Sequence, residues 1–277
     1  MFLSKKGRSF QLPVPEKPKT DVKTMVSMAE GATYKIYEVP ISGWYYGEVR
    51  SAAGVSPYKG TSGISGKAAS AVYLYAGTKV ILWGATVRWT GFPAPTDDWG
   101  GTGGTVFDGE GGSGGGGAAN NAPDHWYRDG GGGAGMLFGY TATPYFTLKN
   151  EESLFEMKPY EIPGIYSVDC VYAAILCGGA GAGCSDEGTV RGSGGGGGAW
   201  GNGGFVWNNN HTGPYAVGTN GPGGDFGKGG NGGLWQQSYG GDGGWAILNF
   251  TTGEFSYGQG GGIRGASDGY AILYKLG

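Results

Sequence analysis

Glycine is concentrated in blocks, and this distribution constrains the fold more than any other feature of the chain. Residues 100–135 contain 16 glycines in 36 positions, residues 136–177 contain two in 42, and residues 178–245 contain 28 in 68. Such density is typical of flexible linkers and low-complexity disorder. Aromatic residues nevertheless make up 14% of the chain, and disordered chains are poor in aromatics. The pattern therefore predicts a folded protein in which glycine blocks alternate with ordinary apolar segments.

The apolar segments have the length and alternation of β-strands. Residues 34–39 and 43–50 alternate in polarity, and residues 168–177 are apolar on both faces, as in a central buried strand. Residues 71–75 and 79–83 flank an Ala-Gly-Thr turn, which predicts a hairpin. No segment has a capped helical period. Further strands are expected at residues 136–138, 145–148, 245–250 and 270–274. We predict an all-β fold, a β-sandwich or jelly roll.

The glycine blocks have two open interpretations, surface loops or packed polyglycine II-type helices. An extended left-handed helix makes no internal hydrogen bonds, so its backbone groups must pair with neighbouring segments. Several such segments can then pack side by side, because they carry no side chains. Five tryptophans lie in or beside the blocks, where a flexible linker would avoid them: Trp99, Trp126, Trp200, Trp207 and Trp235.

The first 29 residues differ in composition from the rest. They contain one glycine, three prolines and six basic residues, and the prolines favour extended backbone. We interpret residues 1–29 as an extended attachment arm and residues 30–277 as a glycine-rich β-sandwich domain, with possible halves at 30–150 and 151–277. A loose tail is the alternative for the arm. Docking is favoured by its apolar residues, namely Phe2, Leu3, Phe10, Leu12 and Val14.

Composition and spacing argue against several classes of function. The formal net charge of -3 gives no reason to expect nucleic-acid binding, and no apolar run is long enough for a membrane-spanning helix. Cys170, Cys177 and Cys184 match no metal spacing, so we interpret them as buried thiols in a reducing compartment. Neither His125 nor His211 can be tied to a nucleophile. We expect no enzymatic activity, no cofactor and no metal site.

Several stretches together carry a resemblance to a known family. The matching stretches are a strand ending in Ile-Pro at residues 162–163, an apolar strand at 76–84, glycine clusters at 114–117 and 194–198, and a closing Gly-Asp-Gly-Gly-Trp-Ala-Ile-Leu strand at 241–248. This set of stretches resembles the glycine-rich domain of bacteriophage tail and fibre proteins, and is similar to the polyglycine-helix adhesins at tail-fibre tips. The resemblance covers most of residues 70–277.

The resemblance implies a virion structural protein of the fibre, adhesin or decoration type, assembled in the host cytoplasm. The arm would bind other virion proteins, the chain would be a homo-oligomer, by analogy a trimer, and exposed loops would bind a host-surface glycan or outer-membrane protein. A bacterial cell-surface or matrix structural protein is the alternative. Aromatic and amide side chains suit receptor contact, although the aromatics can instead be spacers between glycine segments. The candidates are Trp126, Tyr127, Trp200, Trp207, Asn208, Asn209, His211 and Tyr215, with Asn120, Asn121, Asp124 and His125 beside the first two.

Overall fold

The described part of the chain is built of β-strands. The computed structural model describes residues 15–19, 22–31, 33–54, 62–86, 119–121, 126–128, 131, 133–140, 144–147, 156–159, 173–181, 240–249 and 254–277. These residues form fourteen strands and no helix, which confirms the predicted all-β class. In two places the structure describes only short antiparallel pairs. These are β6 (Ala119–Asn121) with β7 (Trp126–Arg128), and β9 (Pro144–Thr147) with β10 (Glu156–Pro159).

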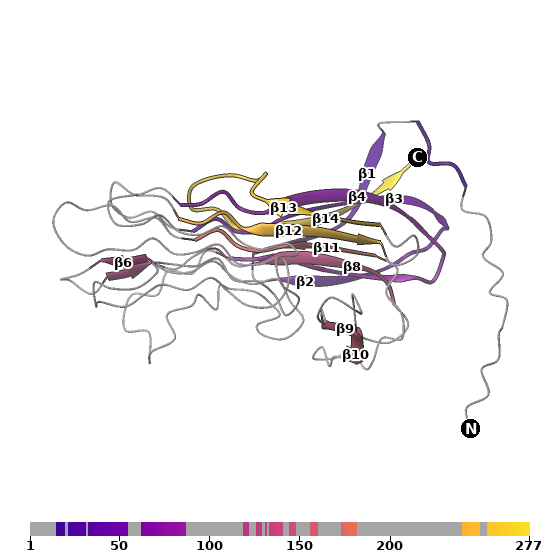
Figure 1. Cartoon of the computed structure of the whole chain (residues 1–277). Coiled ribbons are helices and arrows are strands. Elements are labelled where there is room, and N and C mark those ends of the chain that lie inside the picture. Colours follow the sequence, from indigo (N-terminus) through magenta and orange to yellow (C-terminus); the bar gives the residue numbers. More distant parts are fainter. Residues whose placement is uncertain are drawn as a thin grey trace, which may run out of the picture.

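Two larger antiparallel sheets pack face to face as a sandwich (Figure 1). The four-stranded sheet has, in order, β1 (Lys23–Glu30), β14 (Tyr270–Leu276), β3 (Gly43–Arg50) and β4 (Lys67–Leu74). The six-stranded sheet has, in order, β13 (Glu254–Gln259), β12 (Gly244–Asn249), β11 (Ala173–Cys177), β8 (Ala134–Tyr140), β5 (Lys79–Trp83) and β2 (Tyr34–Glu38). Each sheet therefore combines strands from before and after residue 150.

One long ribbon joins the two sheets. In one sheet β2 pairs with β5, and Glu38 lies opposite Lys79; in the other β3 pairs with β4, and Gly43 lies opposite Leu74. Four residues on each side connect the pairs, and Val39 bonds to the turn in both directions, donating to Thr78 and accepting from the amide of Gly77. The pairing thus continues in one register across the edge of the sandwich.

The predicted hairpin of residues 71–75 and 79–83 is therefore wrong. The turn exists, with Gly77 at φ +83° and the Thr78 amide donating to Tyr75 at 3.0 Å. Its two flanking strands, however, belong to opposite sheets. A three-residue turn signal predicts that the chain reverses, but it does not show whether the two flanking strands pair with each other. Here β4 pairs with β3 and β5 pairs with β2, so the turn is a corner between the two sheets.

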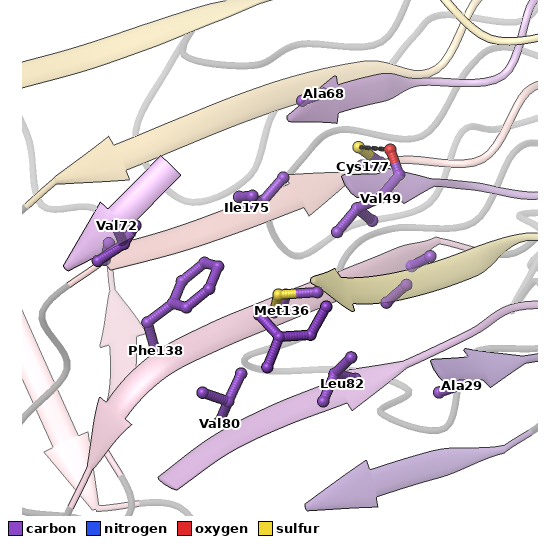
Figure 2. Close-up of a cluster of buried hydrophobic side chains, with 14 of the residues drawn as sticks. Ala29, Val49, Ala68, Val72, Val80, Leu82, Met136, Phe138, Ile175 and Cys177 are labelled. Atoms are coloured by element: carbon purple, nitrogen blue, oxygen red, sulfur yellow. Dashed lines mark hydrogen bonds between the residues drawn. The ribbon is translucent and has the colours of Figure 1, made fainter. Parts of the chain in front are cut away.

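The core lies between the two sheets, and Figure 2 shows part of it. Phe138, Met136 and Ile175 project from the six-stranded sheet and are fully buried. Opposite them is Gly47 of β3, where a Cβ would lie 2.7 Å from both the Met136 sulfur and the Phe138 ring. The missing side chain at Gly47 lets the larger side chains fill the interlayer space.

The centre of the six-stranded sheet is buried on both of its faces. All five residues of β11 are buried, including Ala174 and Leu176, which alternate with the core residues. On β5, which is separated from β11 by β8, Ile81 and Trp83 lie on that same second face and are 0% and 1% exposed. The prediction of a central strand that is apolar on both faces is confirmed for residues 173–177, while residues 168–172 of the predicted strand lie outside the described residues.

The N-terminal segment joins the four-stranded sheet before residue 29, the position at which the composition of the chain changes. Residues from Lys23 onward form β1 and pair with β14 along its length, so the last part of the segment that we separated at residue 29 is a strand. Its Lys-Thr-Met-Val-Ser-Met sequence does not alternate in polarity, and a register shift between Met25 and Ser27 breaks the period further.

Candidate functional site

Five glycine-rich segments leave the strands together at one end of the sandwich. We call them, with Gly131, the glycine bundle: residues 51–54, 62–66, 178–181, 240–243 and 260–269. Each continues a strand of one of the two large sheets, and Figure 1 shows them leaving at the end opposite the C-terminus. This end is where the largest glycine blocks of the sequence adjoin the sandwich, so it is the part of the fold that the composition singled out.

The segments of the bundle hydrogen-bond directly to one another through their backbones. Segment 178–181 bonds to four different neighbours, whereas a strand within a sheet has only two. Its Gly181 accepts from the Gly63 amide at 3.0 Å and donates to Gly241 at 2.8 Å. Its Ala180 accepts from the Gly131 amide at 2.8 Å and donates to Ala52 at 3.2 Å. The bonds therefore run in several directions around the segment, as in a bundle of extended chains.

At several glycines of the bundle there is no room for a side chain. A Cβ built on Gly243 would overlap the carbonyl oxygen of Gly178, and one on Gly63 would overlap that of Gly241. A Cβ on Gly131 would overlap the carbonyl of Ala52. At these positions, glycine is required by the approach of a neighbouring backbone rather than by a positive φ.

Small polar side chains add further hydrogen bonds to the backbone of the segments. The Ser51 hydroxyl is fully buried and donates to the Gly178 carbonyl at 2.6 Å. The Asp242 carboxylate accepts the Ile64 amide at 2.6 Å. Ser62 and Ser65 accept two further amides from segment 260–269. Buried backbone groups are costly to leave unpaired, so these contacts help to hold the bundle rigid.

The two described tryptophans of the six-stranded sheet pack over glycine. Trp83 on β5 lies opposite Gly135 on β8, and a Cβ on that glycine would overlap the indole ring. Trp245 on β12 lies opposite Gly258 on β13, where a Cβ would lie 2.7 Å from the ring. Each ring covers backbone that glycine leaves bare, a cross-strand arrangement that stabilises glycine within sheets. At these two positions tryptophan acts as a spacer.

A second distinctive surface is the outer face of the four-stranded sheet. Trp44 on β3 and Tyr73 on β4 are cross-strand partners with rings 5.9 Å apart, and Tyr75 lies 5.2 Å from Tyr73. Tyr46 lies 6.2 Å from Tyr274 of β14. All five rings are partly exposed. We call this set (Trp44, Tyr46, Tyr73, Tyr75 and Tyr274) the outer aromatic face.

An ionic cluster adjoins the outer aromatic face. Lys67 lies 3.0 Å from the Glu48 carboxylate, and the Tyr270 hydroxyl donates to the same carboxylate at 2.7 Å. Partial burial acts to raise the pKa of Glu48, but the hydrogen bonds from Tyr270 and Lys67 outweigh it and lower the pKa. Burial and the bond to Glu48 raise the pKa of Tyr270, while the bond to Glu48 raises that of Lys67. The cluster is a fixed ion pair rather than an acid-base pair tuned to neutral pH.

Among the predicted receptor contacts, the structure describes the backbone of one group. Trp126 and Tyr127 lie on β7, and Asn121 and Asn120 lie directly opposite them on β6. The fold thus brings the two halves of this predicted patch into register. The other predicted residues lie outside the described residues: Asp124, His125, Trp200, Trp207, Asn208, Asn209, His211, Tyr215 and the arm residues Phe2, Leu3, Phe10, Leu12 and Val14.

Within the described residues, the remaining candidates for chemistry are few. Cys177 is a buried free thiol whose pKa is raised by burial, as we interpreted it, and Cys170 and Cys184 lie outside the described residues. No group of three or more His, Cys, Asp or Glu side chains is placed to hold a metal in the part of the chain that the structure describes. A helix of the length and apolarity needed to cross a membrane does not occur there either.

Comparison with known proteins assigns no function to the glycine bundle or to the outer aromatic face. No protein-family model matches the chain, and no curated protein sequence matches it significantly. The glycine bundle and the outer aromatic face are therefore the two features of this fold that bear on its function.

Proposed function

We propose that this protein is a structural component of a bacteriophage particle, of the fibre, adhesin or decoration type. The single observation that carries the proposal is the glycine bundle, in which segment 178–181 is hydrogen-bonded to four neighbouring segments. Ordering glycine is entropically expensive. Glycine segments packed in this way form a thin, rigid support with few side chains. Such a support can hold loops away from the sandwich.

In this proposal, the role of each part of the fold follows from its position. The sandwich is the base, the bundle extends from one end of it, and the long glycine blocks follow in sequence from the bundle segments. Loops on a rigid scaffold are a common way to bind a partner without a deep pocket. In this proposal, aromatic and amide side chains carried by those blocks contact a host-surface glycan or outer-membrane protein, and a homo-oligomer, by analogy a trimer, presents them together.

The sequence resemblance to phage tail and fibre proteins supports the same proposal. The bundle is the kind of packing expected for a polyglycine-helix domain, whereas glycine-rich surface loops would not bond to one another so extensively. The part of the N-terminal arm that precedes β1, residues 1–22, is the proposed attachment to other virion proteins, because it is basic and carries apolar residues.

The test is the location of the protein in its source. Antibodies against the purified chain should label phage particles from that source at a fixed place, and mass spectrometry should find the chain in the purified particles. A chain that is missing from particles but present on the surface of the producing bacterium would overturn the proposal and favour a cell-surface or matrix structural protein.

A further inference from the structure

The outer aromatic face contacts the N-terminal arm at one described point. The indole N–H of Trp44 donates to the carbonyl of Pro15 at 2.9 Å, across 29 positions of sequence. Pro18, three residues further on, is partly buried. The described start of the arm therefore lies against the four-stranded sheet.

The arm has the sequence of a polyproline II ligand. Residues 12–18 read Leu-Pro-Val-Pro-Glu-Lys-Pro, and the last four residues of this segment have Pro-x-x-Pro spacing. A polyproline II helix has three residues per turn, so Pro15 and Pro18 lie on one edge of it. Such helices keep their backbone carbonyls free, and proteins bind them on grooves lined by aromatic rings.

Trp44 and its neighbours supply the complementary surface. Trp44, Tyr73 and Tyr75 form a row of edge-to-face rings, each partly exposed, with interplanar angles of 78° at both contacts. Flat rings cover the apolar pyrrolidine faces of proline, and an indole N–H at the edge of the row meets a ligand carbonyl. Recognition of a polyproline helix requires ring faces for the prolines and a fixed hydrogen-bond donor for a backbone carbonyl, and this row of rings supplies both.

The length of chain between residue 19 and β1 allows the arm to reach the aromatic rings of its own molecule. Lys23, the first residue of β1, has its ammonium group 3.5 Å from the ring centre of Tyr46, two residues from Trp44. β1 is separated from β3 by one strand, which is about 10 Å between strand axes. The four steps of chain from Lys19 to Lys23 can span about 13 Å, so the arm reaches the rings without crossing to another copy.

We propose that Trp44, Tyr73 and Tyr75 form a recognition site for a polyproline II segment, and that this chain's own Pro-x-x-Pro segment, residues 15–18, occupies it. The site does not depend on the phage assignment, because any protein with this arm and sheet would make the same contact.

The experiment measures trypsin cleavage after Lys19 in the full-length folded protein, by mass spectrometry of early time points. Each rate is divided by the rate for a free peptide of residues 10–20, which carries any substitution made within that segment. Trp44→Ala should raise the normalised rate about 5-fold or more, as expected for losing a hydrogen bond together with its ring contacts. Trp44→Phe keeps a ring but loses the donor, and should give a smaller rise. Tyr34→Ala, a partly exposed tyrosine on the other sheet, is the control and should leave the rate unchanged.

A second variant keeps the test decisive if Trp44→Ala does not fold. Pro15→Ala changes only the segment before β1 and adds no site for trypsin, and its control is Glu16→Ala in the same segment. The proline variant should be cleaved several-fold faster than the control. Equal rates would overturn the proposal. A wild-type rate that falls as protein concentration rises would also overturn it, because a second copy would then be the occupant.

Discussion

Adding one methyl group at Gly243 tests the glycine bundle directly. A Cβ at this position would overlap the carbonyl oxygen of Gly178 and lie 2.9 Å from the amide nitrogen of Gly66. Both neighbours are backbone, so no side chain can rotate away and the segments must separate. Gly243 itself donates to Ile64 at 2.9 Å and accepts from the Gly260 amide at 2.8 Å, and these bonds are strained by the separation.

The size of the effect follows from two contributions. Overpacking costs about 1–3 kcal/mol, and each buried hydrogen bond that is weakened or lost costs about 1 kcal/mol net. If both bonds of Gly243 are lost, Gly243→Ala should destabilise the protein by about 3–5 kcal/mol. For a chain of this length that lowers the melting temperature by about 6–20 °C.

The matched control is the same chemical change at Gly43, at the start of β3. Only the Lys275 side chain comes within 4.0 Å of a Cβ there, so Gly43→Ala should be neutral or slightly stabilising, because alanine has less freedom in the unfolded chain. Thermal and urea unfolding of both variants measure the difference. If Gly243→Ala unfolds within about 1 kcal/mol of Gly43→Ala, the close backbone packing is refuted.

Three further outcomes are expected. Trp83→Ala should destabilise by about 3–5 kcal/mol in urea unfolding, because the ring is buried over a glycine, whereas Trp126→Ala should leave the melting temperature unchanged and abolish host attachment if Trp126 is a receptor contact. Deleting residues 1–14 should preserve the melting temperature, while deleting residues 1–29 removes β1 and should lower it clearly. Because its pKa is lowered in the fold, Glu48 contributes stability that is complete above its unfolded value of 4.5 and is lost as pH falls through the lower folded value. Glu48→Gln should therefore make the melting temperature less dependent on pH in that acidic range.

Local patterns in the sequence predict the individual strands well. The predicted strands at residues 43–50 and 79–83 match β3 and β5 at both ends, because alternation and a bounded apolar run are local properties. In the two large sheets, β1 and β13 are not predicted, since neither has a clean period, and the short strands β6, β7 and β10 are not predicted either. β13 has the sequence Glu-Phe-Ser-Tyr-Gly-Gln and ends just before two glycines with positive φ, Gly260 and Gly261.

Pairing between distant segments is what the sequence does not reveal. The turn at Gly77 is visible in the sequence, but the exchange of partners from β3 to β2 that makes it a corner is not. The Ser51 hydroxyl bonds to a carbonyl 127 positions away, and no local signal identifies such a contact. Glycine density predicted packed segments or loops as two alternatives for the blocks. The backbone hydrogen bonds of the bundle show packing at residues 178–181 and 240–243, the edges of the second block, whereas most of both blocks lies outside the described residues.

The outer aromatic face illustrates the same limit for the candidate sites. Alternation along residues 43–50 separates Trp44 from the buried Tyr45, so its exposure is predictable. Its proximity to Tyr73 and Pro15 is not, because it depends on the register of β3 with β4 and on the path of the arm.

Amide hydrogen exchange at single-residue resolution tests the central claim most directly. The backbone amides of Gly63, Gly181 and Gly243 each donate to a carbonyl of another bundle segment, and exchange reports the opening of such bonds. We expect these amides to exchange as slowly as those of the central strand β11. Exchange within seconds at all three, with β11 protected, would show that the glycine segments are open loops and would contradict the account.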